Sequence, residues 1–278
     1  MSGGRAEPRQ QSSLAVQAEG GPWYLINASP DVRQQLELIR DPGETRLRSS
    51  PFAGVILTDA EIDHTAGLII LRESATPLRL YGTAAVREAL TVGFPLLEVL
   101  DAYCGVRWTF LEPEAPLELT EVEGQGLRVE AFEVAGDPPL YMKGRTGGGV
   151  PTGTVTGLVL TDLSTGGTAV YVPAVGDLDD ELLAKISRAD AVFIDGTFWS
   201  EDELTGLGIG TRTATDMGHL PLSGPGGSLE RLRGIEGTRR ILVHINNSNP
   251  ILLHDSEERA AVESAGVEIS YDGMQVDL

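Results

Sequence analysis

The 278-residue sequence has one cysteine, Cys104, and only two lysines, Lys143 and Lys185. A single cysteine excludes an internal disulfide framework and a zinc ribbon built from cysteines. Long apolar runs are missing too, because none approaches the roughly 18 residues of a membrane-spanning helix. Residues 1–20 lack the apolar core of a signal peptide. We therefore expect a cytoplasmic protein that does not bind a membrane.

Positive charge is scarce throughout the chain. Lys and Arg number 21 against 41 Asp and Glu, which gives a formal net charge of −20. A chain this acidic is repelled by phosphate backbones, so we expect no nucleic-acid partner. The acidic residues are spread along the sequence and apolar residues make up 41% of it, which indicates a folded protein rather than a disordered acidic tail.

Short apolar or β-branched runs, separated by many of the 34 glycines and 16 prolines, predict a fold of short strands and tight turns. The predicted strands lie within 12–18, 22–28, 54–59, 78–82, 106–111, 127–134, 156–163, 168–175, 190–198, 239–245 and 267–273. Helical spacing is found at 31–39, 65–71, 83–92, 179–189, 228–234 and 256–266. Helices interspersed without strict βαβ alternation favour an α/β sandwich. With no repeat and no visible boundary, one domain over 1–278 is predicted.

The segment LTDAEIDHTAG places three carboxylates and an imidazole at the end of a predicted strand. Asp59, Glu61, Asp63 and His64 lie within six residues, and carboxylates this close disfavour one another's ionisation. A divalent metal is a natural counter-charge, and this mixture of oxygen and nitrogen ligands suits iron, manganese or zinc. The alternative is a solvated turn whose aspartates cap a helix beginning near Thr65.

The remaining histidines differ in their surroundings. His244 ends another apolar strand, so it is either a structural residue or a partner of the first site, because two strand ends can converge. His219 lies in a loop bounded by glycine and proline and is a ligand, a general acid or base, or a residue without a role. His254 precedes a helix cap and is expected on the surface. Asp195 ends a wholly apolar strand, where an acid is usually functional or binds loop amides.

These residues suggest a family. The run TDAEIDH resembles the HxHxDH signature of the metallo-β-lactamase superfamily, with Asp59 and Glu61 in place of its first two histidines. More narrowly, blocks from residue 5 to residue 274 resemble the coenzyme PQQ synthesis protein B family. They are RxxPRxQSSLAV, INASPDVRQQL, LTDAEIDHTAGL, DGTFWSEDE, MGHLPLSG, VHINNSNPIL and YDGM.

The resemblance implies a metallo-β-lactamase-like four-layer αβ/βα sandwich with two mixed β-sheets and a metal at one edge. Carried over to this sequence, one of the two superfamily metal sites has lost its imidazoles, whereas the other keeps Asp63, His64 and His244. Two imidazoles and a carboxylate resemble the ligand set of non-haem Fe(II) oxygenases, so Fe(II) is expected, with zinc and manganese as alternatives and O₂ as cosubstrate. Asp59 and Glu61 would accept hydrogen bonds from the ligands or supply an alternative carboxylate ligand.

The family resemblance implies an iron- and O₂-dependent hydroxylase that acts on the tyrosine ring of a Glu–Tyr-derived PQQ precursor, which is a small molecule or short peptide. His219 and Asp195 resemble an auxiliary acid/base pair of the superfamily, with His219 as the base that takes the phenol proton. Asn246 and Asn247, just past His244, are expected to orient the amino-acid groups of the substrate.

Two other functions stay open at this stage. One is a metal-dependent hydrolase of the metallo-β-lactamase type, against which the lost imidazoles argue. The other is a carrier that transports PQQ or its precursor. With a net charge of −20, a carrier for an acidic quinone would need Arg145, Arg212 or the pair Arg239 and Arg240 to line its site.

One part of the family pattern is missing from this sequence. The family usually begins with a strand and a cysteine cluster that holds a structural zinc, and this chain starts about where that segment ends. We therefore expect no structural zinc of that kind and an open sheet edge, which is either tolerated or covered by a second subunit in a homodimer.

Overall fold

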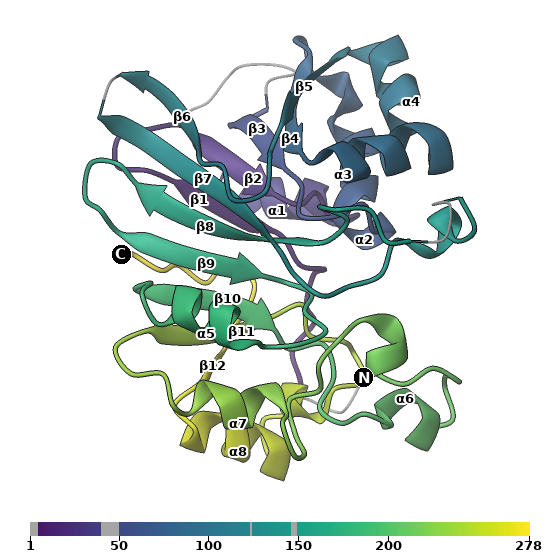
Figure 1. Ribbon diagram of the computed structural model, residues 1–278, viewed down its shortest axis with the longest axis vertical. Helices are drawn as coiled ribbons and strands as arrows, with labels where there is room; N and C mark the ends of the chain where they lie inside the picture. Colours follow the sequence, from purple (N-terminus) through teal and green to yellow (C-terminus); the bar gives the residue numbers. More distant parts are fainter. Residues whose placement is uncertain (1–4, 40–49, 123, 146–148) are drawn as a thin grey trace. The chain divides into compact units, whose positions relative to one another are not determined.

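The computed structural model describes residues 5–39, 50–122, 124–145 and 149–278 (Figure 1). The chain forms two compact units. The N-terminal unit comprises Gln10–Glu133 and Asp137–Gly166, and the C-terminal unit comprises Met1–Arg9, Val134–Gly136 and Gly167–Leu278. The single domain expected from the sequence stays a prediction.

The N-terminal unit contains a five-stranded mixed sheet in the order β1-β2-β3-β4-β5. Its strands are β1 (Leu14–Gln17), β2 (Trp23–Ile26), β3 (Phe52–Ile56), β4 (Leu78–Gly82) and β5 (Val106–Phe110). β1 pairs antiparallel with β2, and every other neighbouring pair is parallel. The central strand β3 is nearly all buried, which explains why its sequence is apolar without alternation.

Helices of the N-terminal unit pack on this sheet through a leucine-rich core that includes Leu57, Leu68, Leu80, Leu90 and Leu100. They are α1 (Val32–Ile39), α2 (Ile62–Thr65), the 3₁₀ helix η1 (Ala66–Glu73), α3 (Ala84–Glu88), the π-helical turn η2 (Ala89–Gly93), α4 (Leu96–Tyr103) and the 3₁₀ turn η3 (Leu140–Met142). The sequence analysis missed α4. It follows Pro95 without a side-chain cap and is apolar around most of its circumference, so it lacks the usual helix signals.

An antiparallel ladder completes the N-terminal unit. It is formed by β6 (Leu117–Val122), β7 (Gln125–Glu133) and β8 (Thr156–Asp162). The sequence analysis also missed β6. On this strand Glu118 lies opposite Arg128 of β7, and the two side chains form an ion pair of 2.8 Å. This cross-strand pair stabilises a strand whose own sequence is rich in charge.

The C-terminal unit contains four parallel strands, ordered β12-β11-β10-β9. They are β9 (Thr168–Val172), β10 (Ala191–Asp195), β11 (Arg239–Val243) and β12 (Glu268–Ile269). Its helices are α5 (Asp180–Ile186), α6 (Glu203–Gly206), η4 (Thr215–Met217), α7 (Ser228–Leu232), η5 (Pro250–Leu252) and α8 (Glu257–Ser264). The short helix α6 was not predicted from the sequence.

The register of β10 and β11 brings functional residues to one sheet end. Asp195, the last residue of β10, lies opposite Val243, the last residue of β11, and the strands run side by side (Figure 1). The residue after Val243 is His244, so the carboxyl ends of both strands carry polar side chains. Across the part of the chain that the structure describes, no helix has the length and apolar character needed to cross a membrane.

Candidate metal centre

In the N-terminal unit, a buried hydrogen-bond network fixes the segment that follows β3. Asn27 adopts a left-handed backbone conformation with φ of 58°. Its side chain donates to Thr58 Oγ1 at 2.8 Å and accepts from the amide of Thr58 at 3.0 Å. Thr58 Oγ1 in turn lies 2.8 Å from Asp59 Oδ2. The position of Asp59 therefore depends on Asn27, the residue that directly follows the neighbouring strand β2.

Asp59 and His64 form a buried pair, and each is 1% exposed. His64 Nδ1 lies 2.8 Å from Asp59 Oδ1 and 2.7 Å from Asp59 Oδ2. Asp59 Oδ1 also accepts from the amide of Glu61 at 2.9 Å, and the helix α2 begins at Ile62. Asp59 thus contacts the start of a helix, but the idea of a solvated turn is wrong for this carboxylate, because it is buried against an imidazole.

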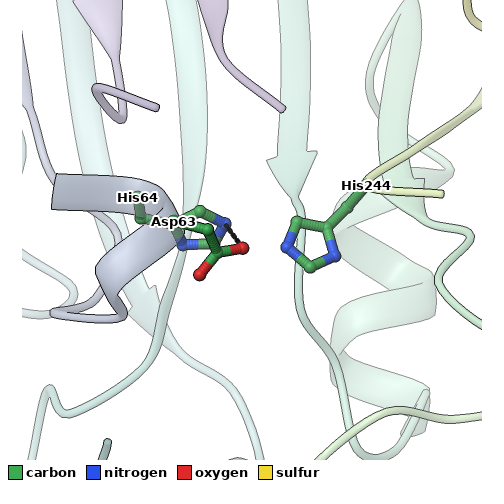
Figure 2. Close-up of side chains that lie close together, drawn as sticks. All are labelled: Asp63, His64 and His244. Carbon is green, nitrogen blue, oxygen red and sulfur yellow. Dashed lines mark ion pairs between the residues drawn. The ribbon is translucent and has the colours of Figure 1, made fainter. Parts of the chain in front are cut away.

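Asp63 is the second carboxylate beside His64. Figure 2 shows both side chains at the start of α2, where His64 Nε2 lies 3.9 Å from Asp63 Oδ2. Because Nδ1 donates its hydrogen to Asp59, Nε2 is the nitrogen that carries the lone pair in the neutral ring. Glu61, from the same segment, is exposed. This segment therefore has the nitrogen and oxygen donors expected of metal ligands.

Asp59 holds a proton on His64 when no metal is bound. Burial alone lowers the pKa of His64, but the charge and hydrogen bond of Asp59, helped by Asp63 and Glu61, raise it to about 9. Burial also acts to raise the pKa of Asp59, yet His64 outweighs this and the pKa of Asp59 is lowered. The buried pair is therefore ionised at neutral pH.

This pair predicts a pH dependence of stability for the metal-free protein. The pKa of His64 rises from 6.5 to about 9 on folding, so the folded state binds the proton more tightly than the unfolded state. The resulting stabilisation is complete below pH 6.5 and is lost as the pH rises through 9. Urea denaturation should give a free energy of unfolding that falls between these two pH values. His64→Gln is the control, and a fall of the same size in that variant would contradict the assignment.

In the C-terminal unit, Asp195 accepts four hydrogen bonds and is 1% exposed. Its Oδ2 accepts from the amide of Val175 at 3.0 Å and from His219 Nδ1 at 2.6 Å. Its Oδ1 accepts from the amide of Thr197 at 2.9 Å and from the Thr197 hydroxyl at 2.6 Å. Burial alone would raise the pKa of Asp195, but the charge and hydrogen bond of His219 lower it below its ordinary value.

His219 and His244 come together in this unit. His219 follows Gly218, whose φ of 82° makes the left-handed turn that leads into the histidine. His244 itself has φ of 56°, a rare conformation for a side-chain-bearing residue and one found at functional sites. The two imidazole rings stack with centroids 5.4 Å apart. A ligand atom from each of Asp195, His219 and His244 lies within 4.8 Å of the others.

Thr197 was not among the predicted site residues. Its hydroxyl lies 2.7 Å from His244 Nδ1, as well as contacting Asp195. The only sequence signal is its place two residues after the acid that ends β10. His244, drawn in Figure 2, is half-buried. Nδ1 of His219 is thus engaged by Asp195, and Nδ1 of His244 is engaged by Thr197.

The loop that follows His244 carries Asn246 and Asn247. Asn246 is half-buried and its side-chain oxygen accepts from the amide of Asn247, which is exposed. Glu203 of α6 anchors the same loop, because its Oε1 accepts from Ser248 Oγ at 2.6 Å. Its Oε2 accepts from the amide of Trp199 at 2.7 Å. Sequence reasoning missed Glu203, which links two segments far apart in the chain.

The arginines considered for an anionic ligand are engaged in structural contacts. Arg239 forms two hydrogen bonds of 3.0 Å with Glu268. Arg240 donates to two backbone carbonyl oxygens at 2.9 and 3.2 Å, and Arg145 donates to one at 3.2 Å. Arg212 likewise donates to a backbone carbonyl of its own loop. These contacts weaken the argument for an arginine-lined carrier site. His254 is exposed, as predicted.

Residues 22–245 match the family model of the beta-lactamase superfamily domain. The fold agrees with distant solved structures, among them a diphosphatase from the PhnP family (17% identity, TM-score 0.65, covering 100% of this chain and 88% of that one). The short form of human tRNase Z is a second such structure (15% identity, TM-score 0.59, covering 97% of this chain and 93% of that one). The α/β class and the metallo-β-lactamase-like fold expected from the sequence are confirmed.

Closer relatives share one name. Coenzyme PQQ synthesis protein B of Nitrosococcus oceani is 42% identical over 280 residues, which cover 99% of this chain and 90% of the relative. The protein of that name from Cupriavidus taiwanensis is 43% identical over 281 residues, covering 99% of this chain and 89% of the relative. The crystal structure of Zn²⁺-bound PqqB from Methylobacterium extorquens is 37% identical, with a TM-score of 0.87, and the match covers 99% of this chain and 90% of that one. The chain belongs to the coenzyme PQQ synthesis protein B family.

Proposed function

We propose that this protein acts in the cytoplasm in PQQ biosynthesis, as an Fe(II)- and O₂-dependent hydroxylase of the tyrosine ring in a Glu–Tyr-derived precursor. Membership of the coenzyme PQQ synthesis protein B family supports the pathway. The observation that carries the chemistry is the state of the two ligand histidines. Nδ1 of His64 is held by Asp59 and Nδ1 of His244 by Thr197, so Nε2 is the metal-binding nitrogen of each.

The donors fit a metal ion. Asp63, His64 and His244 would hold it, with Asp59 as the hydrogen-bond partner of His64 and Glu61 as an alternative carboxylate. A solved relative with bound Zn²⁺ supports a metal in this family. Zinc and manganese accept the same donors as iron, and we favour Fe(II) because two imidazoles and one carboxylate are the ligands of non-haem oxygenases. The metal would supply the activation of O₂ that no side chain provides.

The protein's own residues would accept the phenol proton. His219 donates from Nδ1 to Asp195 at 2.6 Å, which leaves Nε2 as the basic nitrogen. As the ring is hydroxylated the phenol must lose its proton, and His219 Nε2 would accept it. The buried Asp195 carboxylate would stabilise the imidazolium formed. Asn246 and Asn247 would orient the amino and carboxyl groups of the substrate.

The test is turnover of a Glu–Tyr-derived substrate under ¹⁸O₂ by the full chain, first stripped of metal and then loaded with Fe(II), Zn²⁺ or Mn²⁺. The assay contains a two-electron reductant such as ascorbate, because inserting one oxygen atom into the ring leaves the other to be reduced to water. We expect the product to gain ¹⁸O with the Fe(II)-loaded protein and not with the Zn²⁺- or Mn²⁺-loaded protein. His254→Ala, an exposed histidine, should keep full activity. Turnover of an ester, amide or phosphodiester without O₂ would instead identify a hydrolase. Tight binding of PQQ by metal-free protein without turnover would identify a carrier.

A further inference from the structure

A single hydroxyl connects Asp195 to the second ligand histidine. Thr197 Oγ1 lies 2.6 Å from Asp195 Oδ1, 2.7 Å from His244 Nδ1 and 2.9 Å from the backbone oxygen of His244. Thr197 is buried, so water does not compete freely for these contacts. All three residues belong to the C-terminal unit.

The direction of each hydrogen bond follows from counting hydrogens. Asp195 accepts from the backbone amides of Val175 and Thr197 and lies 2.6 Å from His219 Nδ1, which indicates an ionised carboxylate with no hydrogen of its own. The Thr197 hydroxyl has one hydrogen and two acceptor oxygens near it. It points that hydrogen at Asp195 Oδ1, because this contact, at 2.6 Å and to an ionised carboxylate, is shorter and stronger than the 2.9 Å contact with the backbone oxygen of His244. Oγ1 is then an acceptor toward His244, and His244 Nδ1 must be the protonated nitrogen.

We infer that Thr197 is a positioning residue. Its hydroxyl donates to Asp195 and therefore accepts from His244, so that one buried carboxylate sets the tautomer of two histidines. Oδ2 of Asp195 holds His219 directly, and Oδ1 holds His244 through the hydroxyl. This inference rests on the proposed function only in that His244 is taken as a metal ligand. It assigns Asp195 a supporting part, because both of its oxygens are already occupied by four donors.

The unusual backbone conformation at His244 is a second reason to expect a residue that fixes the orientation of its ring. His244 follows β11 in a left-handed conformation, with φ of 56°. The Thr197 hydroxyl oxygen accepts from the His244 ring at 2.7 Å, so a residue outside this turn fixes the orientation of the imidazole. A threonine supplies this hydroxyl on a β-branched side chain with few rotamers, which limits the orientations of the ring.

The test is histidine-selective ¹⁵N NMR of the metal-free full chain, with signals assigned by His244→Gln. We expect His244 of the wild type to be protonated at Nδ1. Thr197→Val keeps the shape but removes the acceptor, and should convert His244 to the Nε2-protonated form while His219 keeps its tautomer. Thr197→Ser should retain the wild-type state. Thr238→Val is the matched control, because Thr238 is equally buried and its hydroxyl bonds only the carbonyl of Ile186.

Zn²⁺ titration gives a second readout. Thr197→Val should bind Zn²⁺ roughly 10- to 100-fold more weakly, the usual cost of removing a residue that orients a metal ligand. Nε2-protonated His244 in the wild type would overturn the inference even if the valine variant failed to fold. So would an unchanged tautomer in folded Thr197→Val. If these tautomers are found but no oxygenation occurs with Fe(II), the proposed reaction fails and the role of Thr197 stands.

Discussion

Replacing His64 by alanine is expected to abolish metal binding and oxygenation and to lower the free energy of unfolding by about 3–5 kcal/mol. In the proposed site His64 would supply an Nε2 ligand, and its ring is the charged partner of Asp59. With the ring removed, Asp59 keeps its bonds to Thr58 and Glu61 but remains a buried carboxylate without a cation. An uncompensated buried charge costs far more than a lost surface contact.

Isothermal titration with Zn²⁺, oxygenation assays and urea denaturation measure these effects, and related variants separate them. His244→Ala should also lose the metal but less stability, about 1–3 kcal/mol, because Thr197 keeps its bond to Asp195. Asp59→Asn combined with His64→Ala should recover part of the stability and none of the metal binding. His254→Ala should change stability by no more than about 0.5 kcal/mol. Activity that survives in His64→Ala would disprove the ligand assignment.

Replacing Asp195 by asparagine is expected to lower kcat by on the order of 10⁴-fold, the effect of the same exchange behind the catalytic histidine of serine proteases. All four groups around Asp195 are donors. The new amide nitrogen is a donor as well, so it must oppose at least one of them. The histidines should then turn to other tautomers, so that His219 loses its proposed role as the base for the phenol proton and His244 loses its orientation.

Activity assays, Zn²⁺ titration and ¹⁵N NMR of both histidines test this variant. The control is Asp190→Asn, because Asp190 precedes the same strand and accepts from the amide of Thr168 at 2.8 Å, but is exposed and contacts no histidine in the described structure. We expect Asp190→Asn to keep near-wild-type activity. An active Asp195→Asn with unchanged histidine signals would show that the carboxylate does not set their tautomers.

The sequence alone was sufficient to indicate the family, the fold class and most of the acids and histidines of the candidate site. Spaced blocks from residue 5 to residue 274 indicated the family, and apolar runs located eleven of the strands that the structure describes. Acids and histidines that end apolar strands are visible because a charged or polar residue there interrupts a strong pattern. Asp59, Asp195 and His244 were found in this way, and His64 through the cluster of acids before it.

Only the tertiary structure decided which of these side chains form hydrogen bonds with one another. Thr197 and Asn27 look like any other polar residue after a strand, and their roles arise only because neighbouring strands set them beside His244 and Thr58. The register that aligns Asp195 with Val243 places the His244 ring within reach of Thr197. Composition and spacing therefore determined which candidate ligand types the chain offers. The tautomers and the ionisation of the buried pairs depend on distances of a few ångströms, which arise only when the strands pair.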